Sequence, residues 1–289
     1  MANTFGKAKP GRGKSENTNK HRLSVQSIID LVISKADIIL EVLDARFIEK
    51  TRNPYLEKKA KSLGKELIYV LNKADLVDHE KIEKEQELQG LQPWVFFSSR
   101  QQKQMKETGK KAGKVQGNNM LMEMIGNQAR KIGSETVNIG VIGYPNTGKS
   151  SLINFLTGKK AARTSSEAGH TRGVQKVKIG NGIYLLDTPG IIPMEEKAYG
   201  NRELLAKHVE IGSITWDRAR DPIMIVHRIM MDYPNILEKH YRIEAEGDAE
   251  ILIESLGNKM HFLKKHGLVD DARTAKQILK DWQEGKIRI

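Results

Sequence analysis

The sequence of 289 residues predicts an α/β protein, in which a doubly wound, mostly parallel six-stranded sheet is followed by an all-helical C-terminal region. Two observations support this fold class. Six short apolar runs have the length and composition of buried strands, and the segments between most of them are long enough for crossover helices. From Ala198 onward the pattern is helical instead. Strands that alternate with helices favour a parallel sheet, because parallel neighbours need a crossover connection.

The predicted elements follow one another along the chain. The strands are DIILEVLD (37–44), ELIYVLN (66–72), WVFFSS (94–99), VNIGVIG (137–143), VQKVKIG (174–180) and GIYLLD (182–187). Helices are expected between them, among others at GNNMLMEMIGNQARKI (117–132) and SLINFLTG (151–158). In the helical region, DDARTAKQILKDWQEG (270–285) places Ala275, Ile278, Leu279 and Trp282 on one face, and Gly285 can stop the helix.

Charge and composition divide the chain into three parts. Residues 1–22 carry six Lys and Arg against Glu16 and few apolar side chains, which predicts a flexible basic arm. Residues 23–197 contain the predicted sheet, including a second basic stretch at 100–114 with six Lys and Arg against Glu107. Residues 198–289 balance fifteen basic against fifteen acidic side chains, so this helical domain is neutral overall. Attraction of polyanions is therefore expected mainly at the two basic stretches.

Several classes of protein are excluded by composition. No apolar run approaches the roughly 20 residues that cross a bilayer, and the N-terminus lacks the apolar middle of a signal peptide. A cytoplasmic protein is therefore expected. The absence of cysteine excludes disulfides, thiolate nucleophiles and cysteine-based zinc sites.

A phosphate-binding motif follows the fourth predicted strand. GYPNTGKS (143–150) fits G-x-x-x-x-G-K-[ST] and leads into a predicted helix, which is the context that the motif requires. Backbone N–H groups would surround the phosphates, Lys149 would reach the β and γ oxygens, and Ser150 would bind Mg²⁺. The alternative is an ordinary glycine-rich turn. Nucleotide contacts are predicted for Asn146, Thr147, Gly148, Lys149, Ser150 and Ser151.

Two further segments suit a nucleotide that carries a γ-phosphate. LLDTPG (185–190) ends an apolar strand, so Asp187 would lie beside the magnesium shell and the Gly190 backbone N–H near the γ-phosphate. Thr171, in EAGHTRG, would close over the metal only when the γ-phosphate is present. The alternative for that segment, read alone, is an ordinary surface turn.

Guanine recognition is predicted for the loop after the second strand. Asp75 of NKAD (72–75) can accept two hydrogen bonds from guanine, a pair that adenine does not donate. Asn72 and Lys73 are expected to tie this loop to the phosphate loop and to the base. Ser98 and Ser99, after the third strand, complete the predicted base site, where the Ser99 N–H would face the guanine carbonyl. A lone tetrapeptide of this kind is more often a simple strand-to-helix turn.

The order of these motifs is unusual. A Ras-like GTPase begins with the phosphate loop and ends with the guanine-reading loops, whereas here NKAD and the serines come first. If the termini of the usual domain are joined and the chain is cut before the fourth strand of that usual order, the present order results without a change in the packed sheet. The chain therefore predicts a circularly permuted P-loop GTPase domain, with ligands at the carboxyl ends of its strands.

The permuted order, together with DAR (44–46) after the first strand, resembles the circularly permuted ribosome-assembly GTPases of the YlqF/RbgA type. The resemblance covers nearly the whole chain after the basic arm. It implies a helical domain that contacts ribosomal RNA and a role late in large-subunit assembly. Asp44 and Arg46 match the family's DAR positions, and we interpret them as structural; the sequence alone favours a strand-end turn with a surface ion pair. Two departures are AGHT, where Pro-Gly commonly precedes the Thr, and the neutral helical domain.

The resemblance also bears on hydrolysis. Ile191 stands where Ras-like proteins carry the water-orienting glutamine, so slow intrinsic GTP hydrolysis is expected. His21 is the first candidate for the catalytic group that positions water, by its spacing from DAR, and His170 is a weaker one; the alternative for His21 is a solvated side chain. Asn146 matches an asparagine that related GTPases use to hold K⁺. GTP or GDP and Mg²⁺ are thus the predicted ligands, with K⁺ as a further hypothesis.

The prediction is a GTP-hydrolysing switch whose partner is ribosomal RNA or a ribosomal subunit, the large one, with neither membrane nor DNA as partner. The LLDTPG segment (185–190), which contains the DxxG motif of GTPases, leads directly into the helical domain, so contact with the γ-phosphate would bias that domain's orientation. Two alternatives remain. One is a GTPase acting on tRNA or the small subunit, although the β-barrel and Cys-rich module usual in permuted small-subunit factors are not visible. The other is an RNA-binding scaffold that holds GTP structurally.

Overall fold

The computed structural model describes residues 25–84, 88, 90–99, 116–158, 175–187 and 202–289. Several predicted features lie outside these residues. They are the basic arm, the basic stretch at 100–114, the predicted domain boundary at 197/198, and the site residues His21, His170, Thr171, Gly190 and Ile191.

A six-stranded sheet forms the centre of the N-terminal part, as predicted. Its strands are β1 (Ile38–Asp44), β2 (Glu66–Asn72), β3 (Trp94–Phe96), β4 (Val137–Ile142), β5 (Gln175–Gly180) and β6 (Ile183–Asp187). They are arranged in the order β3-β2-β1-β4-β6-β5. Every pairing is parallel except that of β5 with β6. The carboxyl ends of the parallel strands therefore lie along one edge.

One predicted strand ends early. The run WVFFSS is extended only over Trp94–Phe96, and the last pairing of this edge strand is Phe96 with Leu71. Its neighbour among the described strands, β2, ends at Asn72, and the next residue, Lys73, adopts a left-handed conformation with φ 62°. The partner backbone turns away there, so Ser98 and Ser99 leave the sheet and become part of a loop at its carboxyl edge.

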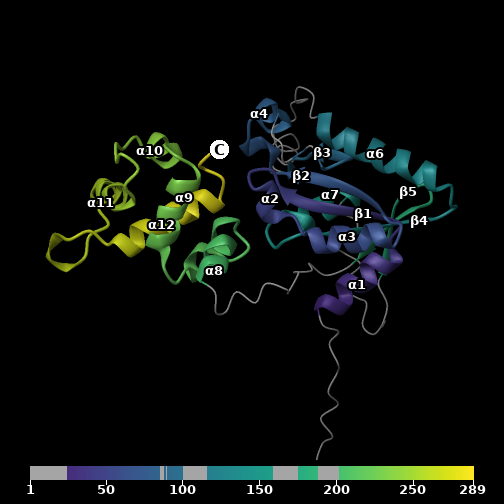
Figure 1. Cartoon of the computed structure of the whole chain (residues 1–289), viewed down its shortest axis with the longest axis horizontal. Helices are drawn as coiled ribbons and strands as arrows, with labels where there is room; N and C mark the ends of the chain where they lie inside the picture. Colours follow the sequence, from purple (N-terminus) through teal and green to yellow (C-terminus); the bar gives the residue numbers. More distant parts are fainter. Residues whose placement is uncertain (1–24, 85–87, 89, 100–115, 159–174, 188–201) are drawn as a thin grey trace, which may run out of the picture.

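Helices cover both faces of the sheet, which makes it doubly wound (Figure 1). Apolar side chains of α1 and α3 pack on one face, and those of α6 and α7 on the other. Strand β1 serves both faces, with Ile38, Leu40 and Val42 on the α6 side and Ile39 and Leu43 on the α1 side. The helices are α1 (Val25–Lys35), α2 (Ile48–Thr51), α3 (Pro54–Ser62), α4 (His79–Lys84), α6 (Gln116–Ile132) and α7 (Lys149–Leu156), with a 3₁₀ turn η1 (Ala74–Leu76).

The C-terminal part is helical. It consists of α8 (Arg202–Glu210), η4 (Trp216–Arg218), α9 (Pro222–Asp232), α10 (Ile236–Tyr241), α11 (Ala249–Lys259), η5 (Lys265–Gly267) and α12 (Asp271–Gln283). The predicted face of α12 is confirmed, because Ala275, Ile278, Leu279 and Trp282 are fully buried and the helix ends before Gly285. Within the described part of the chain, no helix combines the length and apolar character that a bilayer crossing requires.

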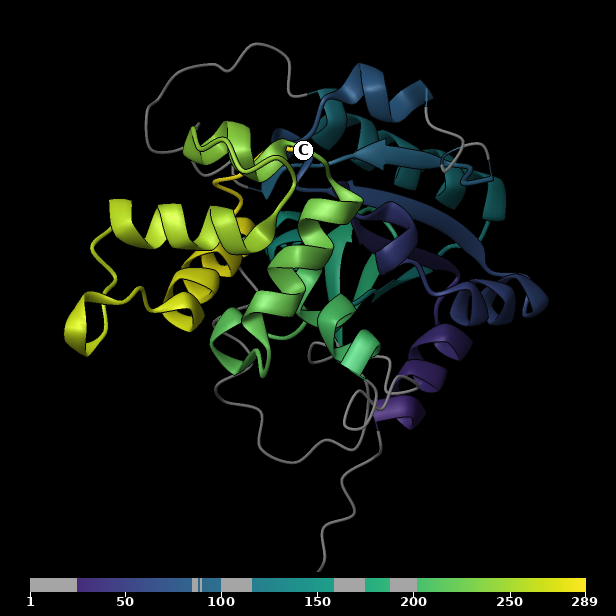
Figure 2. The ribbon, with the colours of Figure 1, turned by 60° about the vertical axis from the view of Figure 1, so that its left-hand side comes forward.

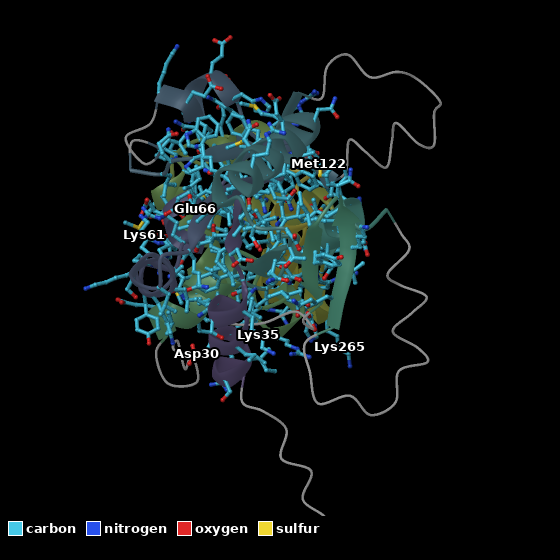
Figure 3. All side chains as sticks on the ribbon, turned by 90° about the vertical axis from the view of Figure 1, so that its right-hand side faces the viewer. Asp30, Lys35, Lys61, Glu66, Met122 and Lys265 are labelled. Atoms are coloured by element: carbon cyan, nitrogen blue, oxygen red, sulfur yellow. The ribbon has the colours of Figure 1, made fainter. Side chains whose placement is uncertain are left out.

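The helical region lies beside the carboxyl edge of the sheet (Figures 1 and 2). Its apolar core includes two residues from the loops at that edge, Phe47 after β1 and Tyr144 after β4. The opposite, amino edge faces solvent, where Figure 3 shows the exposed charged residues Lys35, Lys61 and Glu66. The helical region therefore covers the same edge at which the predicted ligand-binding loops gather.

A buried carboxyl interrupts the apolar pattern of β1. Glu41 is fully buried, its Oε1 accepts a hydrogen bond from the Asn53 N–H at 2.9 Å, and Oε2 has no hydrogen-bond partner among the described residues. Burial, reinforced by the nearby Glu57 carboxylate, raises the pKa of Glu41 from 4.5 to about 8. Glu57 itself is held by Arg52 and by the Tyr69 hydroxyl. Glu41 is therefore neutral near pH 7.

We predict that the stability of the fold falls as pH rises from about 4.5 to about 8, because native Glu41 keeps a proton that the unfolded chain releases. Glu41→Gln retains the neutral shape and removes this loss. The change that Glu41→Gln makes to the free energy of unfolding should therefore be more favourable at pH 9 than at pH 5, by roughly 2 to 4 kcal/mol. Urea unfolding at both pH values measures this, with Glu66→Gln as the exposed control. An equal effect of Glu41→Gln at both pH values would contradict the assignment.

Candidate functional site

The phosphate-type loop joins β4 to α7. Gly148 precedes the helix in a left-handed conformation, φ 103°, and Lys149 is its first residue. Lys149 is buried, and its Nζ donates to the Tyr144 carbonyl of the same loop. Burial lowers the pKa of the Lys149 ammonium to about 8. A buried cation at a helix N-terminus favours an anion beside it, so this loop has the chemistry of a phosphate site.

A second loop, after β2, is hydrogen-bonded to the first. The Asn72 side-chain amide donates to the Thr147 carbonyl at 2.6 Å, which joins two segments that lie 75 positions apart in the sequence. The approach is close enough that a Cβ on Gly148 would lie 1.9 Å from Asn72 Nδ2. Asn72 Oδ1 is buried without a hydrogen-bond partner among the described residues. The Asn72 side chain is thus fixed between the two loops.

The predicted base-reading residues lie in the loops after β2 and β3, at the same edge of the sheet. Asp75 lies on η1, and its Oδ1 accepts a hydrogen bond from the Ser98 hydroxyl at 2.6 Å. Ser98 is buried and Ser99 is half-buried beside it. A carboxylate oriented by a hydroxyl is suited to receive a pair of N–H donors from a ligand, and Asp75 has two oxygens to offer.

Lys73 points to β1 rather than to the phosphate loop. Its Nζ lies 2.7 Å from Asp44 Oδ2, and the same carboxylate receives Arg46 Nη2 at 2.8 Å. Burial opposes the charge on Asp44, but the adjacent Arg46 and Lys73 hold its pKa at about 2. Burial also lowers the pKa of Lys73, against the attraction of Asp44. The DAR residues thus form an ion pair, but Asp44 is fully buried and Arg46 nearly so, which differs from a surface pair.

The helical region contacts the phosphate-type loop directly. Asn146, with φ 60°, donates from its side-chain amide to the Gly212 carbonyl at 2.6 Å. Tyr144 is buried. Its ring centroid lies 6.0 Å from the ring centroid of His208 and 5.6 Å from Lys207 Nζ, and both residues belong to α8. Sequence analysis missed this contact. The signal was an aromatic residue inside a loop otherwise built of small and polar residues, which indicates that something covers the loop.

The structure brings most of the predicted site residues together at the carboxyl edge. The described ones are Asn72, Lys73, Asp75, Ser98, Ser99, Asn146, Thr147, Gly148, Lys149, Ser150 and Ser151. Ser150 and Ser151 are exposed on the first turn of α7. Asp187 is the last residue of β6, so its backbone ends at this edge, but its side chain is outside the described part.

The NKAD residues (72–75) form an NKxD loop, which precedes the phosphate-type loop in the sequence and is hydrogen-bonded to it. On a doubly wound sheet, this arrangement defines a circularly permuted P-loop nucleotide-binding fold. Residues 138–241 match the family described as "50S ribosome-binding GTPase". The GNP-bound crystal structure of YlqF from Thermotoga maritima is similar with a TM-score of 0.58 and 25% identity, over 90% of this chain and 93% of that chain.

Sequence relatives agree with this class. An uncharacterized GTP-binding protein of Methanocaldococcus jannaschii is 39% identical over 270 residues, which is 92% of this chain and 66% of that protein. Nucleolar GTP-binding protein 2 of Saccharomyces cerevisiae is 32% identical over 89% of this chain and 50% of that protein. The chain thus spans less than two thirds of the length of these relatives. In sequence and fold it is similar to the YlqF-type circularly permuted GTP-binding proteins.

We predict that Gly148→Ala separates the two loops. The new Cβ would meet Asn72 Nδ2 at 1.9 Å, and alanine disfavours a φ of 103°, so the Asn72–Thr147 hydrogen bond should break. The expected loss is about 2 to 4 kcal/mol in the free energy of unfolding, measured in urea. Gly158→Ala is the matched control: its φ is also positive, at 61°, but its Cβ would meet nothing within 4 Å. That variant should lose about 1 kcal/mol from backbone strain alone. Equal losses would contradict the proposed contact.

Proposed function

We propose that this protein is a guanine nucleotide switch, which hydrolyses GTP to GDP and phosphate slowly and acts in assembly of the large ribosomal subunit. One observation carries the nucleotide part of the proposal. The Asn72 amide joins the NKxD loop to the phosphate-type loop, so the loops that would hold a base and phosphates lie next to each other. A purine nucleoside triphosphate carries a base and phosphates in one molecule, so it fits this pairing of loops better than a lone anion does.

The described residues suit GTP chemically. Asp75 would accept two hydrogen bonds from guanine while Ser98 keeps its carboxylate in place. Lys149 would exchange the Tyr144 carbonyl for phosphate oxygens, and the nearby negative charge would raise its lowered pKa. The backbone N–H groups around Gly148 and Lys149 would hold the phosphates at the start of α7.

A divalent cation fits the donor set of the family motif. Ser150, exposed on the first turn of α7, would hold Mg²⁺ with Thr171 and Asp187, and Gly190 would contact the γ-phosphate. When bound, the metal neutralises charge that develops on the phosphate oxygens. Hard oxygen donors of this kind suit Mg²⁺.

Slow hydrolysis is part of the proposal because Ile191 occupies the position of the water-orienting glutamine. His21 remains the candidate for positioning water. Asn146 is the candidate for holding K⁺ through its amide oxygen. The hydrogen bond from its amide nitrogen to Gly212 supports this, since it fixes which way the amide faces.

The proposed client rests on the relatives and on charge. The matching family is described as binding the 50S ribosome, and one relative is named as a nucleolar GTP-binding protein. Both strongly basic stretches of this chain, 1–22 and 100–114, suit a salt-sensitive contact with RNA phosphates. We also propose a cytoplasmic location. The alternatives that the experiments test are a GTPase acting on the small subunit or on tRNA, and an RNA-binding scaffold that holds GTP without hydrolysing it.

We predict that Asp75→Asn weakens GTP binding by about 100-fold, because the amide turns an N–H donor toward the guanine donors. The same change should improve binding of xanthosine triphosphate, whose ring carbonyl accepts that donor. Calorimetry with GTP, ATP and xanthosine triphosphate measures all three affinities. Asp78→Asn, a nearby exposed carboxylate, is the control and should leave them unchanged. Equal affinity of the unaltered protein for ATP and GTP would rule out the guanine assignment.

We predict that purified large subunits increase single-turnover GTP hydrolysis by at least about tenfold and that the protein cosediments with them in a GTP analogue. Small subunits and tRNA should do neither. The same assay in potassium and in sodium buffer tests the K⁺ site, where equal rates would remove it. Binding of GTP without stimulation by large subunits, small subunits or tRNA would favour the RNA-binding scaffold. A preference for small subunits would overturn the assignment to the large subunit.

A further inference from the structure

Asp44 contacts both the NKxD loop and Arg46, the residue that reaches the helical region. Its Oδ2 receives Lys73 Nζ from the NKxD loop at 2.7 Å and Arg46 Nη2 at 2.8 Å. Its Oδ1 accepts from the Arg46 backbone N–H at 3.1 Å and from Nε at 3.0 Å. Because Asp44 is fully buried, these partners supply nearly all of its charge compensation.

Arg46 continues the contact into the helical region. Its Nη1 donates to the Trp282 carbonyl, in the last turn of α12, at 2.8 Å. The Trp282 indole stacks on Phe47 at 5.7 Å and donates through Nε1 to the Glu210 carbonyl, so this turn is fixed to α8 as well. A continuous path of polar contacts therefore runs from Lys73 through Asp44 and Arg46 to Trp282.

The residues that follow α12 also contact the turn after the NKxD motif directly. Gly285 lies so close to Leu76 that a Cβ would meet Leu76 Cδ1 at 2.5 Å. Leu76 is the last residue of η1, the 3₁₀ turn that carries Asp75. Residues that follow α12 thus rest on the turn that presents the base-reading carboxylate.

This interface has room to change. A solvent-open pocket of about 350 Å³ adjoins it, lined by Arg46, Phe47, Val77, Tyr233 and the last residue, Ile289, among others. Close-packed interfaces transmit strain but resist repacking, whereas an open pocket beside a buried ion pair leaves space for a second arrangement.

We propose that Asp44 and Arg46 are positioning residues that couple guanine nucleotide binding to the docking of α12 on the sheet. This inference rests on the proposed function. A nucleotide that draws Lys73 toward itself leaves Asp44 to Arg46 alone, and that change alters the hold of Arg46 on the Trp282 carbonyl. Reciprocity then requires that a change at the α12 contact alters nucleotide affinity by the same factor.

Hydrogen exchange of peptides covering residues 278–289, with and without GDP or a non-hydrolysable GTP analogue, tests the coupling. In the unaltered protein, nucleotide should change exchange in this segment. Arg46→Lys keeps the charge beside Asp44 but cannot contact Asp44 and the Trp282 carbonyl at once. It should bind nucleotide about tenfold more weakly and lose the nucleotide-dependent change.

The control removes a different contact between the two regions. Lys50, on α2, pairs with Glu210 and Asp232 without touching Asp44 or Lys73. Lys50→Met should keep both the affinity, within about twofold, and the nucleotide-dependent exchange. Gly285→Ala acts through Leu76, so it should weaken nucleotide binding although it lies outside the loops, and it provides an independent test if Arg46→Lys does not fold.

The outcomes separate the coupling from the proposed function. Nucleotide that binds without changing exchange in 278–289, or an unchanged response in Arg46→Lys, would overturn the coupling while leaving guanine binding intact. Should Arg46→Lys not fold, unchanged affinity in Gly285→Ala would overturn it. Absence of any guanine nucleotide binding, measured directly in the same samples by calorimetry, would overturn both.

Discussion

The hydrogen bond from the Asn72 amide to the Thr147 carbonyl holds together two loops that the chain builds far apart. It forms because β2 and β4 are both parallel to β1 and end at the same edge of the sheet, so their loops meet there. The turn η1, the buried Lys149 and the start of α7 all take their places from this meeting. Chain order does not matter to it, which is why a permuted sequence builds the same site.

Much of the fold followed from local pattern. The runs at 37–44, 66–72 and 137–143 became β1, β2 and β4 almost residue for residue, because buried parallel strands are continuous apolar segments. The buried face of α12 followed from helical spacing in the same way. The end of β3 did not, since it depends on where its neighbour β2 turns away at Lys73, which is a tertiary constraint.

The predicted site divides along the same line. Motifs with fixed spacing placed Asn72, Asp75 and Lys149 at one edge, as expected for loops that follow parallel strands. The contacts of Asn146 and Arg46 with the helical region were beyond prediction. Their partners are a backbone carbonyl at Gly212 and another at Trp282, and every residue has such a group, so no side-chain pattern marks it.

Phe47 and Tyr144 belong to the sheet by sequence and to the helical core by packing. Phe47 packs against Trp282 and Tyr233, which also contact each other, so its aromatic neighbours all come from the helical region. A fragment that ended before α8 would expose both rings to water at the carboxyl edge of the sheet, where neighbouring apolar groups favour association with other molecules. The helical region therefore also shields this edge of the sheet from unwanted contacts.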